Sequence, residues 1–369
     1  MPANRKVGVS DVAKHAGVAI GTVSNYLNYP ERVSDTLKVK ISKAIAELGY
    51  VPRRSATAGT AATADPSNPR IIGYVMTEIE HSLFTSIFEG IQEVCEDNNM
   101  QVIGLNASSD LERQHELVRT LISLHVTGIL LSTVLDPSQD VTAARSAGIP
   151  IILIDHSNAP GHEPVCAILE NNVSAGQLAA DELIRLGCRH IAFAAHSFDY
   201  ESIQDRQLGV ERAVARTGGK VSYQLINSGG ILLEDGRNLG AKLSNQAERL
   251  HGIHDSESDT DHSAGEPTSL PDGIVTGSDQ LAIGMLMSLT ERGVLRVPDD
   301  LSIIGTEGVC TSAISPMSLT TVQAPGVDMG RKAMMQMLDY IENPVSHVHG
   351  TTLIEPTLVR RASTRPVLE

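Results

Sequence analysis

From Arg70 onward, the sequence alternates between short, continuously apolar segments and longer amphipathic ones, and this alternation restricts the fold more than any other feature. The apolar segments, such as Ile71–Met76 and Pro150–Ile154, have the length of strands and carry no polar face. The segments Ser82–Asn98 and Leu111–His125 repeat apolar residues every three or four positions, as helices with one buried face do. Strands that are apolar on both faces belong to parallel sheets covered by helices on either side. The sequence therefore predicts an α/β fold.

The alternation begins a second time near Pro164, and this restart predicts two similar lobes. Strands are expected at Ala167–Leu169, His190–Ala194 and Leu301–Ile304, with amphipathic helices between them. Two lobes of ordinary size, each with its own core, are favoured over one very large sheet. We expect the first lobe at about 70–165 and 323–350, and the second at about 166–322 and 351–369.

The segment Val9–Asn28 has the pattern of two short helices that cross at a turn. Val12 and Ala13 lie on one face of the first helix, and Val23 gives the second helix an apolar face. Gly17, between them, supplies the backbone freedom that a tight turn needs. Two short helices joined in this way make a helix-turn-helix.

The other face of the second helix is short and polar, which suits a helix that enters the major groove of DNA and contacts base edges. An ordinary pair of helices is the alternative. The residues expected to contact DNA are Ser10, Ala19, Ile20, Gly21, Thr22, Ser24, Asn25 and Asn28, followed by Arg53 and Arg54.

The charge of the chain is divided unevenly. Through Arg54 there are nine basic and four acidic residues, so this part carries 9 − 4 = +5. The whole chain carries −15, and the remainder therefore carries −15 − 5 = −20. A basic head on an acidic body is expected when one small domain meets phosphate, although a basic solvated face is the simpler alternative. A third helix, capped by Ser34 and ended by Gly49, completes a predicted DNA-binding domain of residues 1–52.

Two stretches interrupt the regular pattern. Residues 53–69 are small, polar or proline, and they predict a hinge or linker that is disordered without support. Residues 251–270 are polar and acidic without an apolar period, so we expect a surface insertion. Its His251, His254 and His262 offer ligands for a divalent cation, but a solvated loop is favoured because their spacing is not that of a rigid metal site.

The sequence predicts no metal site and no cofactor. His347 and His349 form an isolated pair in a turn. Four cysteines lie far apart and predict buried free thiols in a reducing compartment: Cys95, Cys166, Cys188 and Cys310. No apolar segment follows the first residues and no apolar run is long enough to span a bilayer, so we expect a cytoplasmic protein without a membrane partner.

The whole chain resembles the LacI/GalR family of bacterial transcription regulators. The densest match is Val9–Tyr50, which contains D-V-A-K-H-A-G-V, T-V-S-N-Y-L-N and A-I-A-E-L-G-Y. Further matches are I-I-G-Y-V, G-I-P-I-I-L-I-D, L-I-R-L-G-C-R-H-I-A-F, S-D-Q-L-A-I-G and V-P-D-D-L-S-I-I-G, in that order from residue 71 to residue 305. The resemblance implies an all-α helix-turn-helix head and an α/β two-lobed, periplasmic-binding-protein-like body with parallel sheets. It also makes residues 70–369 an effector-binding and dimerisation domain.

Ligands of open parallel sheets bind beyond the carboxyl ends of the strands, and the family's effector contacts fall in the corresponding loops. By position, Asp155, Arg206 and Asp279 coincide with polar effector contacts of the family. The full set expected to bind effector is His81, Phe84, Asp155, His156, Tyr200, Arg206, Ser278, Asp279 and Glu307. An arginine among carboxylates can clamp hydroxyls or a charged group, with Phe84 as an apolar wall. Helix capping by the aspartates and a surface ion pair of Arg206 are the structural alternatives.

The head and the linker depart from the family at informative positions. Gly59 stands where the hinge helix of the family carries a leucine that wedges into the minor groove. We therefore expect weaker DNA bending, with Arg53 and Arg54 supplying charge instead. Asn25 replaces a common arginine, which predicts contact with adenine in place of guanine. Ala19 replaces the serine that usually caps the second helix.

The body departs from the family in its polar loops. Asn171, Ser278 and Glu307 replace the usual aspartate, asparagine and aspartate. These exchanges change the hydrogen bonds of the cleft, so the identity of the sugar or nucleoside-like effector stays open.

The favoured interpretation is a dimeric repressor that binds a palindromic double-stranded operator and responds to a small-molecule effector between its lobes. A solute-binding protein of the same fold is one alternative, but it needs export and gives no reason for the basic head. An α/β enzyme is the other, but no G-x-G-x-x-G, G-K-[ST] or G-x-S-x-G motif occurs. The chain ends without a leucine heptad, which favours a homodimer over a tetramer.

Overall fold

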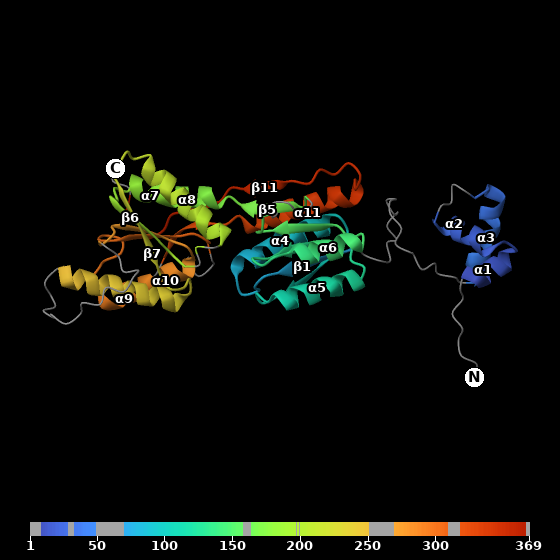
Figure 1. Cartoon of the computed structure of the whole chain (residues 1–369), viewed down its shortest axis with the longest axis horizontal. Helices are drawn as coiled ribbons and strands as arrows, with labels where there is room; N and C mark the ends of the chain where they lie inside the picture. Colours follow the sequence, from blue (N-terminus) through green and yellow to red (C-terminus); the bar gives the residue numbers. More distant parts are fainter. Residues whose placement is uncertain are drawn as a thin grey trace, which may run out of the picture. The chain divides into compact units, whose positions relative to one another are not determined.

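A computed structural model describes residues 9–28, 33–48, 70–157, 164–196, 198, 200–250, 269–308 and 318–366 (Figure 1). The chain divides into two compact units, residues 1–62 and residues 63–369, and each is described by itself. Within the described ranges, no helix is long and apolar enough to cross a membrane. The linker 53–69 and most of the insertion predicted at 251–270 lie outside these ranges.

The head is a bundle of α1 (Val9–Ala16), α2 (Ile20–Asn28) and α3 (Asp35–Leu48). Its buried side chains come from all three helices and from the residue before α3: Val12, Ala13, Val23, Val33, Ile41 and Ala44. Gly17 has φ of 66°, in the left-handed region that glycine adopts without strain, so the predicted turn is confirmed. Ala19 occupies the N-cap position of α2, since the amides of Thr22 and Val23 bond to its carbonyl oxygen.

The first lobe of the body is a parallel sheet with the strand order β11-β5-β4-β3-β1-β2. Helices α4 and α11 cover one face, α5 packs against the other, and α6 lies beside α5. The strands are β1 (Arg70–Met76), β2 (Met100–Asn106), β3 (Gly128–Ser132), β4 (Ile151–Ile154), β5 (Cys166–Glu170) and β11 (Thr351–Ile354). The helices are α4 (Ser82–Asp97), α5 (Leu111–Ser123), α6 (Ser138–Ser146) and α11 (Gly326–Glu342).

The second lobe repeats this plan with the strand order β12-β10-β9-β8-β6-β7, and only β12 runs antiparallel among these described strands. Helices α7 and α8 cover one face, and α9 and α10 cover the other. The strands are β6 (His190–Ala195), β7 (Ser222–Asn227), β8 (Gly273–Thr276), β9 (Ser302–Gly305), β10 (Thr320–Gln323) and β12 (Thr357–Val359). The helices are α7 (Asn172–Arg185), α8 (Glu201–Ala215), α9 (Leu233–Leu250) and α10 (Asp279–Arg292).

The predicted lobe boundaries are wrong at two strands. Both β5 and β11 were assigned to the second lobe, but they pair with each other, and β5 also pairs with β4 of the first sheet. β5 is apolar on both faces, so it fits the interior of that sheet. The chain therefore crosses between lobes just after β5, β10 and β11, at about residues 171, 324 and 355.

Candidate functional site

A cavity of about 320 Å³ opens between the two lobes. Residues of both lobes line it, most of them in loops that follow the carboxyl ends of strands, where parallel sheets bind ligands. The lining residues are Val134, Asp155, His156, Ser157, Leu169, Glu170, Asn171, Asn172, Val173, Tyr200, Glu201, Ser202, Asp205 and Leu353.

Asp155, directly after β4, is held in an unusual backbone conformation at the cavity. Its φ is 58°, and its amide donates to the Ile168 carbonyl across the sheet at 2.9 Å. Such left-handed non-glycine residues cluster at ligand-binding sites. Burial raises the pKa of its carboxyl to about 6, against the opposing fields of Arg206 and His81. Within the described part of the chain, this carboxylate has no hydrogen-bond partner, so it is available to a ligand.

Arg206 joins the two lobes from α8. Its guanidinium donates to Asn172 Oδ1 at 2.8 Å, to the Gly277 carbonyl at 3.0 Å and to Glu170 Oε2 at 3.3 Å. Glu170 ends β5 in the first lobe, and the side chains of the pair are 8% and 1% exposed. The alternative of a surface ion pair is therefore wrong, because Arg206 lies in the second turn of α8 and faces inward.

The other oxygen of Glu170, Oε1, is buried without a hydrogen-bond partner in the described structure. Burial raises the pKa of Glu170 to about 7, although Arg206 favours the ionised form. Buried polar atoms are almost always paired in folded proteins, so an unpaired one at a cavity indicates a place for a ligand atom or water.

Two glycines allow α7 and α8 to pack closely, and this packing positions Arg206. A Cβ on Gly176 of α7 would lie 1.9 Å from the Arg206 carbonyl oxygen, and one on Gly209 of α8 would lie 2.1 Å from the Val173 carbonyl oxygen. Only glycine permits this approach of α7 and α8. The close packing brings Arg206 within reach of Asn172 at the start of α7.

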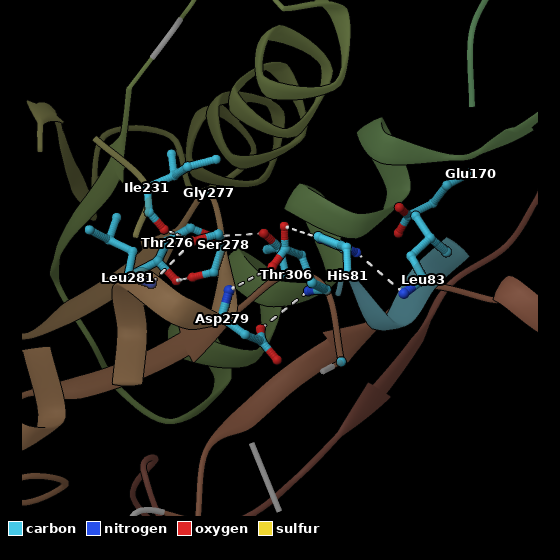
Figure 2. A network of polar contacts seen from close by, with 12 residues as sticks. His81, Leu83, Glu170, Ile231, Thr276, Gly277, Ser278, Asp279, Leu281 and Thr306 are labelled. Atoms are coloured by element: carbon cyan, nitrogen blue, oxygen red, sulfur yellow. Dashed lines mark hydrogen bonds and ion pairs between the residues drawn. The ribbon is translucent and has the colours of Figure 1, made fainter. Parts of the chain in front are cut away.

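A second polar network crosses the cleft from His81 (Figure 2). His81 Nε2 lies 3.3 Å from Oε1 of Glu307, which follows β9 in the other lobe. The Asp279 amide donates to Glu307 Oε2 at 3.2 Å, and the Glu307 amide donates to Asp279 Oδ1 at 3.2 Å. Thr321 Oγ1 donates to that same Oδ1 at 2.7 Å. The network fixes the loop that presents Glu307 to the first lobe.

The pKa shifts of His81 and Glu307 both favour the charged form of each residue. Burial opposes ionisation of both groups, but the hydrogen bond to Glu307 and its negative charge raise the pKa of His81. The His81 hydrogen bond and the positive charges of His81 and Arg206 likewise hold the pKa of Glu307 below its usual range. The contact is therefore an ion pair whenever His81 is protonated.

Several predicted effector residues do not line the cavity. Phe84 is 6% exposed, packs in the core of the first lobe and is not among the residues that line this cavity. Ser278 caps α10, accepting from the Leu281 amide at 3.1 Å and donating to the Ile231 carbonyl at 2.6 Å (Figure 2). Asp279 is fully buried in the network described above. These two residues support the site without reaching the cavity.

Asp155, His156 and Tyr200 do line the cavity, Tyr200 with half of its surface exposed. Burial lowers the pKa of His156, which favours its neutral form. Glu170, Glu201 and Asn172 also line the cavity, although the residues predicted from the sequence do not include them. A charged residue that ends an otherwise apolar strand, as Glu170 does, is the signal that would have found the first of them.

Several of the predicted DNA-contacting positions lie in the described part of the head, in α1, in α2 or just before α2. Ser10, Ala19, Gly21 and Ile20 are exposed, Ile20 by 58%, and Thr22 is partly buried. The side chains of Ser24, Asn25 and Asn28 lie outside the described set, as do Arg53 and Arg54. An exposed apolar residue at the first position of α2 suits contact with a thymine methyl group.

Comparisons with known proteins agree with the division of the chain into a helical head and a two-lobed body. Residues 9–53 match the model for bacterial regulatory proteins of the lacI family. Residues 70–245 match the model for periplasmic binding proteins and the sugar binding domain of the LacI family. Residues 180–364 match the model for the periplasmic binding protein-like domain.

Full-length relatives and a solved structure extend the agreement. The Ribose operon repressor of Haemophilus influenzae is 26% identical over 96% of this chain and 98% of that protein. The HTH-type transcriptional repressor PurR of Aliivibrio fischeri is 26% identical over 96% of this chain and 97% of its own length. A solved transcriptional regulator CelR-cellobiose complex has the same fold, with a TM-score of 0.64 and 22% identity, over 97% of this chain and 100% of that one.

Proposed function

Because this chain belongs to the LacI family of bacterial regulatory proteins, we propose that it is a transcription repressor that binds a palindromic operator and is controlled by a small molecule. The observation that carries the proposal is the cavity between the lobes, bordered by the Arg206–Glu170 pair and near the His81–Glu307 bridge. We expect a cytoplasmic homodimer, since one head makes too few contacts for tight specific binding. The relatives are named as repressors, and none of those reported is named as an enzyme.

The chemistry of the cavity suits a small polyhydroxylated molecule, a sugar or the sugar part of a nucleoside. Asp155 and Glu170 offer carboxylate oxygens, and a protonated Glu170 also offers a hydroxyl donor. Val134, Leu169 and Leu353 supply apolar walls. A volume of about 320 Å³ lies at the low end of small-molecule sites, which span about 300–1,000 Å³. The names of the ribose and cellobiose relatives support this ligand class.

The mechanism follows from which groups bridge the lobes. Ser157 Oγ donates to Glu201 Oε2 at 2.6 Å across the same cleft. A ligand that binds Asp155 and Glu170 competes with these bridges or adds to them, and so changes the balance between closed and open lobes. A ligand shifts that balance only by its difference in affinity for the two forms, and operator and effector affinities then change reciprocally.

The linker makes this regulator different from the general family pattern. With Gly59 at the wedge position and no large apolar residue from 53 to 69, the hinge has no side chain to unstack the central base step. We expect weak bending of the operator, with Arg53 and Arg54 supporting the minor groove or backbone by charge. Circular permutation gels measure the bend, and a strong central kink would contradict this part of the proposal.

Selection of bound DNA from a random pool tests the proposed function, using the full chain with and without a panel of sugars and nucleosides. We expect an enriched palindrome whose recovery changes with one member of the panel. The same compound should raise the melting temperature of the body by mass action. Failure to enrich any palindrome would count against a DNA-binding regulator. Ligand stabilisation without DNA binding would favour the solute-binding alternative.

A further inference from the structure

Three metal-ligating side chains meet in the first lobe, away from the cleft. Cys166 begins β5, and His347 and His349 lie in the segment between α11 and β11. The strands β5 and β11 pair with each other, and α11 lies beside them (Figure 1). Cys166 Sγ lies 3.1 Å from His347 Nε2 and 3.4 Å from His349 Nδ1, and the ligand atoms of all three lie within 4.8 Å of one another. The expectation that the histidines form an isolated pair is therefore wrong.

These distances are close to those of a metal site. Tetrahedral zinc with Zn–S of about 2.3 Å and Zn–N of about 2.0–2.1 Å places sulfur and nitrogen about 3.5–3.6 Å apart. The two sulfur–nitrogen distances in the structure need to lengthen by only a few tenths of an ångström to admit the ion. Side-chain rotation of the two histidines can supply this change, because both lie on a loop.

A neighbouring carboxylate already orients one of the ligands. Asp339 Oδ2 lies 2.6 Å from His347 Nδ1, so Nδ1 carries the proton and Nε2, which faces Cys166, presents a lone pair. This carboxylate–histidine arrangement is the usual support of a metal-bound imidazole. Tyr340 stacks on His347 with ring centres 4.7 Å apart and meets His349 edge-on at 4.9 Å.

The loop turns its two histidines inward and its two valines outward. Val345 and Val348 are 99% and 85% exposed, whereas the His347 side chain is 4% exposed. Apolar burial therefore does not hold residues 343–350 in place. A hydrogen bond from the Cys166 thiol is the simpler role for the cluster, but one thiol proton can serve only one of the two imidazoles. A metal ion uses all three.

We infer that Cys166, His347 and His349 bind a thiophilic divalent transition metal, Zn²⁺ by preference, in a site independent of the effector cleft. One thiolate and two imidazoles are ligands that suit zinc better than calcium or magnesium. The fourth position is left to water or a small ligand, since His349 also lines a cavity of about 660 Å³ together with Tyr340 and Arg145. The cluster lies at the amino end of β5, and Glu170 at the cleft lies at its carboxyl end.

Cobalt substitution tests this site in the full chain, because Co²⁺ bound to a thiolate in tetrahedral geometry gives charge-transfer and visible absorption bands. His251, His254 and His262 are first replaced by alanine, so that the insertion cannot contribute ligands. We expect one Co²⁺ per chain with these bands, displaced by one equivalent of Zn²⁺. Cys166→Ser should abolish the charge-transfer band, and His347→Asn and His349→Asn should each weaken binding at least tenfold.

Two further variants separate a metal site from a merely structural cluster. Asp339→Asn should weaken Zn²⁺ binding about 10–100-fold, the usual effect of losing a carboxylate that orients a metal-binding histidine, and Asp339→Glu should restore part of the affinity. Cys95→Ala, which removes a buried thiol elsewhere in the same lobe, should leave the bands and the affinity unchanged. Less than one bound ion per chain, or bands that survive Cys166→Ser in a chain shown to be folded by circular dichroism, would overturn the inference.

Discussion

His81 at the start of α4 and Glu307 after β9 lie 3.3 Å apart and connect the two lobes across the cleft. Each residue is also fixed within its own lobe, His81 by accepting from the Leu83 amide at 3.3 Å while its Nδ1 is unprotonated. Glu307 is fixed by its exchange with Asp279. The contact therefore depends on the relative position of the two lobes. A ligand that alters it alters lobe closure.

His81→Asn should open the cleft without unfolding α4. Asparagine is a good N-cap, so it can still accept from the Leu83 amide, but its shorter side chain does not reach Glu307. Losing a charge-assisted hydrogen bond of about 1.5 kcal/mol shifts the closed-to-open ratio about tenfold. Small-angle X-ray scattering of the ligand-free chain should show a larger radius of gyration. An unchanged scattering curve at pH 6 would contradict a bridging role.

The same bridge should depend on pH. The pKa of His81 is raised in the folded state, so its contribution is fully present below the ordinary histidine value of 6.5 and is lost as the pH rises through the raised value. We therefore expect the wild-type lobes to open as the pH rises above 6.5 and through this raised value. The His81→Asn variant serves as the control, and its scattering should show no such step.

Arg206→Ala should destabilise the body by about 3–5 kcal/mol, because it leaves Glu170 buried without its cation. Arg216→Ala is the matched control, since Arg216 pairs with Asp181 at 2.7 Å but both side chains are about half exposed. That pair should contribute less than about 1 kcal/mol. Urea unfolding of the two variants measures the difference in the free energy of unfolding. Equal losses would show that burial of the Arg206–Glu170 pair does not increase its contribution to stability.

Glu170 should make the body less stable as the pH rises toward 8. Burial raises its pKa from 4.5 to about 7, so the folded state binds more protons than the unfolded state between these values. Its stabilising contribution is complete below pH 4.5 and is lost through pH 7, by about 3 kcal/mol at most. Glu170→Gln should reduce the change in the urea unfolding midpoint between pH 5 and pH 8. Glu291→Gln, an exposed control, should keep the wild-type slope.

The division into lobes could be predicted because the signals are local. Continuous apolar strands and amphipathic helices follow from period alone, and Gly17 marks the head turn. The assignment of β5 and β11 to a lobe could not be predicted in this way. Which sheet accepts a strand depends on its partners, and β11 pairs with a strand about 185 positions earlier in the chain.

The candidate site was predicted only in part, because local position along the chain does not show which contacts a side chain makes in the fold. Asp155 follows a strand at its carboxyl end and does line the cavity, whereas Phe84 and Asp279 have the right positions along the chain but face other contacts. The depth of Arg206 depends on Gly176 packing against its carbonyl oxygen, which no spacing reveals. The Cys166 cluster joins residues 181 and 183 positions apart, beyond any local motif.

Ala19→Ser should stabilise the head by about 1 kcal/mol. Ala19 is the N-cap of α2 but has no side-chain oxygen to accept from the amides that follow, and serine supplies one. Hydrogen exchange of the full chain should show α2 amides exchanging about fivefold more slowly, since local opening then costs more. Amides of β1 in the body are the internal control. Faster exchange in α2 would mean that serine strains the turn after Gly17.

Asn25→Ala should remove a base contact, not general affinity for DNA. An asparagine amide pairs with N6 and N7 of adenine, so the variant should lose about 1–3 kcal/mol on the selected operator and discriminate less at one position of each half-site. Arg53→Ala is the contrasting change, because loss of a phosphate contact weakens binding to all sequences and lowers the salt dependence by about one ion. Titration of labelled operator and of unrelated DNA at several salt concentrations separates the two. If Asn25→Ala weakens both DNAs equally, the residue contacts the backbone, and the reading of bases by α2 must rest on Ile20, Gly21 and Thr22.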